Sequence, residues 1–370
     1  MNHTQERTRR GLKGWMLSIA LGAIFLLSIV GMAFAEQAGL TKVDDAIASY
    51  APPSNLTGNM VIAGSDTMQP LMLKLVSAFR LIHRDTKLAV QGGGTEKAVM
   101  QFLSDQSTIR RGDAFYGGHQ VSGSVSLLAS SRPLTHDEIE AFRTRYSYEP
   151  TEAPIALDAV AIYVNRENPI QGLTLEQVDA VFGADHKRGL QGDIATWGQL
   201  GLESWVQQPI HLYGRDKQSG TRTFFKHAAL LDGDLKGTVR EEPGSAMEIL
   251  AISRDPLAIG YVGIGFQTSM VKAVPLAEKA GMPFVAPNAE SAAGGSYPLG
   301  RALYLYVKKD PKEELEPVVL EFLKFVNSRE GQRTVAKAGA YPLTAAQVAK
   351  NLQTMTGSAM AATATSPATN

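Results

Sequence analysis

Residues 210–231 read IHLYGRDKQSGTRTFFKHAALL, and this stretch decides the expected fold. The apolar run over 210–214 predicts a strand, the segment from Arg215 to Ser219 predicts a turn, and 220–231 has the spacing of an amphipathic helix. Two other stretches repeat this order of strand, glycine turn and helix. Their turns are Gly64-Ser65-Asp66-Thr67-Met68 and Gln91-Gly92-Gly93-Gly94-Thr95. A fourth turn, Ser130-Ser131-Arg132-Pro133, also follows a strand and precedes a helix.

Repeated units of this kind are typical of α/β proteins with mainly parallel sheets. We expect strands at residues 60–63, 88–91, 125–129, 159–164, 210–214, 258–262 and 302–307. We expect helices at residues 70–83, 97–104, 136–146, 175–182, 220–231, 246–254, 317–326 and 345–352. Capping boxes mark three of the helix starts: Thr135 with Glu138, Thr174 with Gln177, and Thr344 with Gln347.

The composition excludes several classes of protein. The chain has 370 residues, which favours two domains, and its 36 basic residues balance its 36 acidic ones. A basic nucleic-acid interface is therefore not expected. The absence of cysteine excludes disulfide scaffolds, thiolate zinc sites, cysteine nucleophiles and a lipoprotein cysteine. The seven histidines lack metal-ligand spacing, so we expect neither a metal site nor a cofactor.

The first 35 residues have the pattern of an export signal. Four basic residues (Arg7, Arg9, Arg10 and Lys13) precede an apolar run over 15–34, and Ala33-Phe34-Ala35 fits a cleavage site. The alternative is an uncleaved membrane anchor. Without this segment 32 basic and 35 acidic residues remain, a net charge of −3, so an anion would have to be bound by local geometry. We expect a linker or a lead-in segment over 36–58 and a disordered tail over 356–370.

The glycine turns suit a small oxyanion. A helix N-terminus has unpaired backbone N–H groups, glycine lets the backbone approach a ligand, and Ser or Thr hydroxyls add donors. Arg215 can offer its guanidinium fork to two oxygens of one anion, or it can form a salt bridge, at the surface or between lobes, with a neighbour such as Asp216. Asp66 can accept the proton of a protonated anion, or it can cap its own helix. Each hydroxyl can equally be an ordinary helix cap.

Enzyme motifs are missing from the same turns. The sequence has no G-x-S-x-G elbow and no P-loop, and no histidine lies in any of the four turns. We therefore expect a binding protein and no enzyme, with no catalytic residues.

In the order and spacing of these motifs, residues 59–352 resemble the phosphate-binding proteins, the solute receptors of high-affinity phosphate ABC transporters. The resemblance rests on the turns at Gly64 and Gln91, on the Arg-x-x-x-Ser-Gly-Thr pattern that starts at Arg215, and on the stretches 258–261 and 297–299. It implies a type II periplasmic-binding-protein fold, in which two α/β lobes close on a ligand in the cleft between them. The implied lobes are 59–157 with 267–355, and 158–266.

The resemblance also implies a site and a role. The phosphate ligands would be Ser65, Asp66, Thr67, Met68, Thr95, Ser131, Arg132, Arg215, Ser219, Gly220 and Thr221. The protein would be an exported or membrane-anchored monomer that captures inorganic phosphate in the periplasm. It would deliver the anion to an inner-membrane ABC permease with a cytoplasmic ATPase.

Two departures keep alternatives open. Ser131 stands where many relatives have an aspartate that accepts the phosphate proton, and Lys217 stands where relatives often have an aspartate that restrains the arginine. Asp66 or Ser131 would then have to accept the proton, and either Asp216 restrains Arg215 or Arg215 is held less firmly. The alternatives are a receptor for sulfate, molybdate or another oxyanion, a secreted phosphatase-like hydrolase, and an adhesion or signalling module without a ligand.

Overall fold

The computed structural model describes residues 41–105, 114–116 and 123–356, and one compact unit begins at Val43. The predicted signal segment and the predicted tail from residue 357 onward lie outside the described residues. None of the described helices is long and apolar enough to cross a bilayer.

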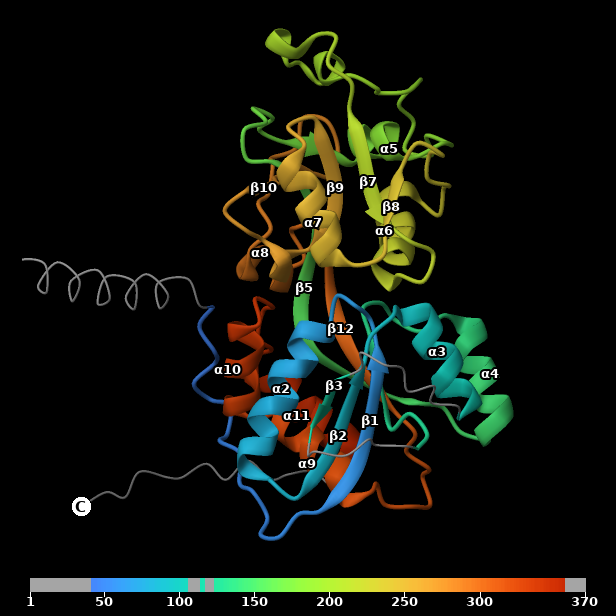
Figure 1. Ribbon diagram of the computed structural model, residues 1–370, viewed down its shortest axis with the longest axis vertical. Coiled ribbons are helices and arrows are strands. Elements are labelled where there is room, and N and C mark those ends of the chain that lie inside the picture. Colours follow the sequence, from blue (N-terminus) through green and yellow to red (C-terminus); the bar gives the residue numbers. More distant parts are fainter. Residues whose placement is uncertain (1–40, 106–113, 117–122, 357–370) are drawn as a thin grey trace, which may run out of the picture. The chain divides into compact units, whose positions relative to one another are not determined.

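Within the described residues, the principal strands pair in the order β3-β2-β1-β4-β12-β5-β9-β7-β8, and β10 pairs with β5 (Figure 1). The strands are β1 (Gly58–Gly64), β2 (Thr86–Gln91), β3 (Ala114–Tyr116), β4 (Leu127–Ser130), β5 (Thr151–Asn165), β6 (Leu173–Thr174), β7 (His211–Arg215), β8 (Arg240–Glu242), β9 (Ala258–Gly263), β10 (Val271–Val274), β11 (Leu276–Ala277) and β12 (Gly300–Val307). The helices are α2 (Gln69–Ile82), α3 (Thr95–Ser104), α4 (His136–Tyr146), α5 (Leu175–Phe182), α6 (Gly220–Leu230), α7 (Ser245–Arg254), α8 (Ala289–Ala293), α9 (Pro317–Val326), α10 (Arg329–Lys337) and α11 (Ala345–Thr356), with short 3₁₀ turns η1 (Trp197–Leu200), η2 (Glu203–Trp205) and η3 (Ile264–Phe266).

Two strands, β5 and β12, connect two α/β lobes (Figure 1). The first part of β5 pairs with β12, and its later part pairs with β9 and β10. Because β5 carries the chain out of the first lobe and β12 brings it back, these two strands are antiparallel. The expectation of mainly parallel sheets is therefore wrong: β1 is parallel to β2 and β4, and β7 to β8 and β9, but every pair made by β5 or β12 is antiparallel.

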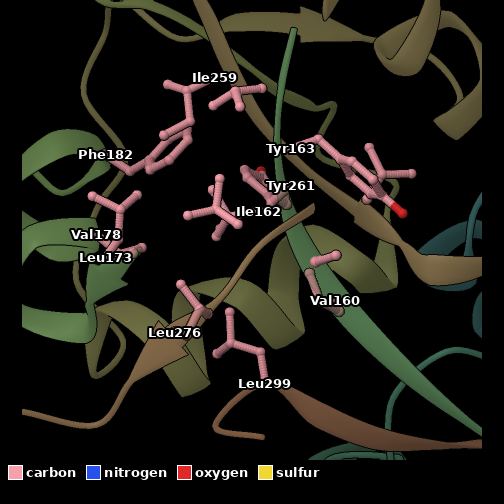
Figure 2. Close-up of a cluster of buried hydrophobic side chains, with 14 of the residues drawn as sticks. Val160, Ile162, Tyr163, Leu173, Val178, Phe182, Ile259, Tyr261, Leu276 and Leu299 are labelled. Carbon is pink, nitrogen blue, oxygen red and sulfur yellow. The ribbon is translucent and has the colours of Figure 1, made fainter. Parts of the chain in front are cut away.

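The first lobe has helices on both faces of its sheet. Successive strand residues point to opposite faces. Ile62 on β1 accordingly faces the core formed with α2, α9 and α10, whereas its neighbour Ala63 faces a smaller core formed with α3 and α4. The second lobe has its own core around β5, β9, α5 and α6 (Figure 2).

The chain returns to the first lobe later than the predicted residue 267. Leu276 and Leu299 lie in the core of the second lobe, as Figure 2 shows, and β10 pairs with β5 while β11 pairs with β6. The apolar residues of 271–299 are buried against β5 and β9, so this segment continues the second lobe until β12 begins at Gly300.

The predicted linker 36–58 is also wrong for its described part. Ile47 is 1% exposed and packs with Leu343 and Val348 near α11. The hydroxyl of Tyr50 donates to Glu321 on α9. This lead-in is therefore part of the first lobe.

Candidate functional site

The three predicted capping boxes are present at the starts of α4, α5 and α11. Thr135, Thr174 and Thr344 each exchange hydrogen bonds with the side chain and the N–H of the residue three positions later. The predicted strands and helices agree with the structure within a few residues, apart from β5, which is much longer than expected, whereas β3, β6, β8, β10, β11, α8 and α10 were not predicted. The turns between them therefore lie where the sequence analysis placed them.

Hydroxyl groups from the turns of the first lobe lie side by side. The Ser65 hydroxyl donates to Oγ of Ser131 at 2.9 Å, and Oγ of Ser131 lies 3.3 Å from Oγ1 of Thr95. All three residues are at most 3% exposed. They come from the ends of β1 and β4 and from the start of α3, which are neighbours because β1 and β4 pair in parallel.

The second lobe brings its own hydroxyls to the same place. Oγ1 of Thr221, in the first turn of α6, lies 2.8 Å from Oγ1 of Thr67 in the first lobe. Ser245 begins α7, and its Oγ lies 3.4 Å from Oγ1 of Thr67. A hydroxyl can rotate its proton toward an anion, so this cluster can act as a set of donors.

Gly220 is required by this close approach. A Cβ atom at residue 220 would lie 2.5 Å from Oγ1 of Thr95 and 2.9 Å from Oγ of Ser131. Gly94 has a similar constraint, since its Cβ would lie 2.1 Å from the Gln218 carbonyl oxygen and its φ is +98°. The glycines of the two motifs thus allow the lobes to meet at the hydroxyls.

Arg215 is the cation of this cluster. Its side chain is 1% exposed; Nη1 donates to Oγ of Ser245 at 2.7 Å, and Nη2 lies 3.2 Å from Oδ2 of Asp66. Its Nε–H has no hydrogen-bond partner among the described residues. The carboxylate that restrains Arg215 is therefore Asp66 from the other lobe, and not Asp216, whose Oδ1 accepts from the N–H of Gln218.

Other predicted ligands are engaged in different ways. Asp66 does not cap α2; its Oδ1 accepts from the N–H of Gly93 at 2.9 Å. The N–H of Met68 donates to the carbonyl oxygen of Ser65 at 3.0 Å. Ser219 is the N-cap of α6 and accepts from the N–H of Arg222. The cap role foreseen as the alternative for Ser219 is thus present.

Arg132 does not face the hydroxyl cluster with a free guanidinium. Its Nε donates to Glu96 at 3.0 Å, its Nη atoms donate to Glu96 and Glu138, and Nη1 also donates to the Pro133 carbonyl oxygen. Every guanidinium nitrogen therefore donates to a protein acceptor. It is linked to the other lobe through Glu96, which accepts from the Thr223 hydroxyl at 2.8 Å.

Four buried groups near the cluster are not among the residues predicted from the sequence: Ser245, Glu248, Asp158 and Arg301. Ser245 follows Gly244 at a fifth strand-to-helix turn, and the rule applied to the other turns would have found it. Asp158 and Arg301 are charged residues inside the apolar strands β5 and β12. A charged residue inside an apolar strand is rarely buried without a partner, so this pattern could have marked Asp158 and Arg301 in the sequence.

Glu248 affects the charge around Arg215. Burial raises the pKa of Glu248 to about 8, although the charge of Arg215 and a hydrogen bond from the N–H of Tyr261 both act in the opposite direction. Below that pH this carboxyl is neutral and does not cancel the charge of Arg215. The buried guanidinium therefore has Asp66 as its ion-pair partner, and its Nε–H remains available.

The chain is similar to known proteins over most of its length. A family model described as PBP superfamily domain matches residues 49–330. The phosphate-binding protein PstS of Pseudomonas aeruginosa is 38% identical over 320 residues, which cover 86% of this chain and 94% of that protein. The chain belongs to the PBP superfamily, in the PstS family.

Its relatives extend to other organisms. The protein SphX of Synechococcus elongatus is 24% identical over 76% of this chain and 77% of that protein. An ABC-type phosphate transport receptor from Vibrio cholerae has a solved structure that covers 77% of this chain and all of its own, with a TM-score of 0.56 and 24% identity. The structure of a substrate-binding protein from Clostridium perfringens also covers 77% of this chain and all of its own, with a TM-score of 0.61 and 22% identity. These structures confirm the type II periplasmic-binding-protein fold predicted for this PstS-family chain.

Proposed function

We propose that this protein captures inorganic phosphate between its two lobes, without catalysis, and releases it to a transporter. The observation that carries the proposal is the meeting of hydroxyl groups from both lobes beside the buried Arg215. A tetrahedral oxyanion needs many short donors around four oxygens and little net charge, which is what these groups offer. The identity with PstS of Pseudomonas aeruginosa supports phosphate as the anion.

Lobe closure would retain the anion. Side-chain contacts that join the lobes at the site include Thr67 with Thr221 and Ser245, Asp66 with Arg215, and Thr223 with Glu96. These contacts would break if the lobes separated, so an anion that bridges both sets of donors would stabilise the closed arrangement. Micromolar binding requires about −8 kcal/mol, which charge-assisted hydrogen bonds in a buried cleft can supply.

The transport role completes the proposal. The segment over 1–35 would export the protein or anchor it at the periplasmic side of the inner membrane. The closed, monomeric protein would then be recognised by a membrane permease coupled to a cytoplasmic ATPase. This part rests on the family and on the N-terminal sequence.

Titration calorimetry with inorganic phosphate tests the capture of the anion. We expect a dissociation constant for phosphate that is micromolar or lower. The variant Arg215→Ala should lose most of this affinity while both lobes stay folded. Arg240→Ala is the matched control, because Arg240 lies on the neighbouring strand β8 and is bonded to the Tyr213 hydroxyl. Equal phosphate affinity in Arg215→Ala and in the unsubstituted protein would contradict this placement of the site.

A sulfate receptor is the second candidate, because both oxygens of Asp66 already accept hydrogen bonds and Ser131 replaces an expected aspartate. A pH series separates the two ligands, since phosphate binding should follow the protonation of phosphate whereas sulfate binding should not. For a phosphatase-like activity, turnover of a generic phosphoester with and without divalent metal is the test, and we expect none.

A further inference from the structure

A buried ion pair lies where the two lobes join. Arg301 on β12 donates from Nε to Oδ2 of Asp158 on β5 at 2.9 Å, and Nη2 of Arg301 lies 2.8 Å from the same oxygen. The two side chains are 2% and 3% exposed. Burying two charges costs several kcal/mol before their attraction repays it, so such a pair calls for a reason beyond stability.

Arg301 also holds one of the turns of the hydroxyl cluster. Its Nη1 donates to the carbonyl oxygen of Ser131 at 2.9 Å, which fixes the turn whose Oγ meets Ser65 and Thr95. Ser131 itself is 0% exposed. The guanidinium therefore fixes the backbone of Ser131, whose side chain belongs to the hydroxyl cluster.

The same pair reaches the second lobe. The N–H of Ile264, after β9, donates to Oδ1 of Asp158 at 3.2 Å. The Phe224 ring on α6 lies 5.4 Å from Cζ of Arg301, next to the turn that carries Thr221. Arg301 and Asp158 thus touch a turn of the first lobe and two elements of the second.

The charges of Arg301 and Arg215 act on each other. Burial lowers the pKa of Arg301, Asp158 raises it, and the positive charge of Arg215 lowers it again. Two buried guanidinium groups that repel each other are stabilised by an anion near both. In addition, Nη2 of Arg301 makes no well-aligned hydrogen bond among the described residues, despite its closeness to Asp158.

We propose that Arg301 is a positioning residue of the anion site, which fixes the Ser131 turn and adds a second buried positive charge, while Asp158 weakens that charge. Binding would then depend on both arginines, with opposite effects of Arg301 and Asp158. The proposal rests on the proposed capture of an oxyanion, and it identifies a determinant of affinity outside the motifs found in the sequence.

Calorimetry with inorganic phosphate on three full-length variants tests this role. Arg301→Gln removes the charge, and we expect phosphate affinity to fall at least about tenfold, because hydrogen bonds and charges near an ion are strong. Arg301→Lys keeps the charge but loses the fork, so we expect a smaller loss. Asp158→Asn removes the opposing charge, so phosphate affinity should rise severalfold even though the thermal midpoint without phosphate falls.

The matched control is Arg188→Gln. Arg188 is a mostly buried arginine of the second lobe that bonds to the carbonyl oxygens of Ala228 and Ala229 and to Glu278. We expect it to lower the thermal midpoint and to leave phosphate affinity unchanged.

The sign of the effects distinguishes the outcomes. A purely structural pair would lower stability in Arg301→Gln and Asp158→Asn alike and would not raise affinity in either, and that result would overturn the proposal while leaving phosphate capture intact. If the unsubstituted protein bound no phosphate, the proposed function would fail, and the role of Arg301 in it would fall too.

Discussion

Nη2 of Arg215 and Oδ2 of Asp66 form an ion pair, 3.2 Å apart, that joins the end of β7 in one lobe to the turn after β1 in the other. The pair has two effects. It restrains the guanidinium that offers donors to an anion, and it places a carboxylate next to the hydroxyl cluster. A carboxylate repels sulfate, but it can accept the proton of hydrogen phosphate.

Asp66→Asn tests that second effect. We expect the variant to lose discrimination between phosphate and sulfate, because an amide neither repels sulfate as strongly nor accepts a proton as well. Phosphate and sulfate affinities measured by calorimetry at one pH provide the test. Asp216→Asn is the control, because Asp216 accepts a hydrogen bond from the Gln218 N–H and not from Arg215. If Asp66→Asn discriminated between phosphate and sulfate as the unsubstituted protein does, another group would have to accept the proton of hydrogen phosphate.

Gly220→Ala should prevent closure of the site. The added Cβ would lie 2.5 Å from Oγ1 of Thr95, far below contact distance, so α6 and the first lobe would have to move apart. We expect phosphate affinity to fall more than about tenfold, with a small change in thermal midpoint, because overpacking costs about 1–3 kcal/mol. Gly237→Ala is the control, since its Cβ would meet no atom within 4 Å. Normal phosphate binding by Gly220→Ala would contradict the close approach.

The sequence predicts the turns well because their signals are local. A glycine and a hydroxyl between an apolar run and an amphipathic helix fix both the chain path and the donor groups, as at Ser65 and Thr221. The partners of the charged side chains depend on contacts across the fold. Arg215 is 149 residues from Asp66, and the local choice of Asp216 was wrong.

The partners of Arg132 and the lobe boundary could not be predicted for the same reason. Glu96 and Glu138 bind Arg132 because α3 and α4 lie together on one face of the sheet, which no local pattern encodes. The boundary at 267 was missed because the short strands β10 and β11 carry little periodicity, while their burial in the second core depends on β5 and β6.

Removal of the hydroxyls of α6 tests the donors of the second lobe. In the double variant Ser219→Ala and Thr221→Ala, we expect most phosphate affinity to be lost, since each lost hydrogen bond to an ion costs about 1.5–3 kcal/mol. Both residues are at most 3% exposed. Circular dichroism should show unchanged helix content apart from the weakened cap at Ser219. Affinity within twofold of the unsubstituted protein would place the anion elsewhere.

Glu248 makes a separate prediction about pH. Burial raises its pKa from the ordinary glutamate value of 4.5 to about 8, so between these values the native protein holds a proton that the unfolded chain has released. The free energy of unfolding should therefore fall as pH rises from about 5 to 8 through this group. In Glu248→Gln, which stays neutral, that part of the slope should vanish.

Denaturant unfolding at pH 5, 6, 7 and 8 measures the effect. The stability of Glu248→Gln relative to the unsubstituted protein should increase steadily with pH. Only the unsubstituted protein has a buried carboxyl whose protonation becomes more costly as pH rises. The exposed Glu203 supplies the control variant Glu203→Gln, which should give a curve parallel to the unsubstituted one. Parallel curves for Glu248→Gln as well would mean that its carboxyl is ionised in the folded protein, and the charge of Arg215 would then be balanced from both Asp66 and α7.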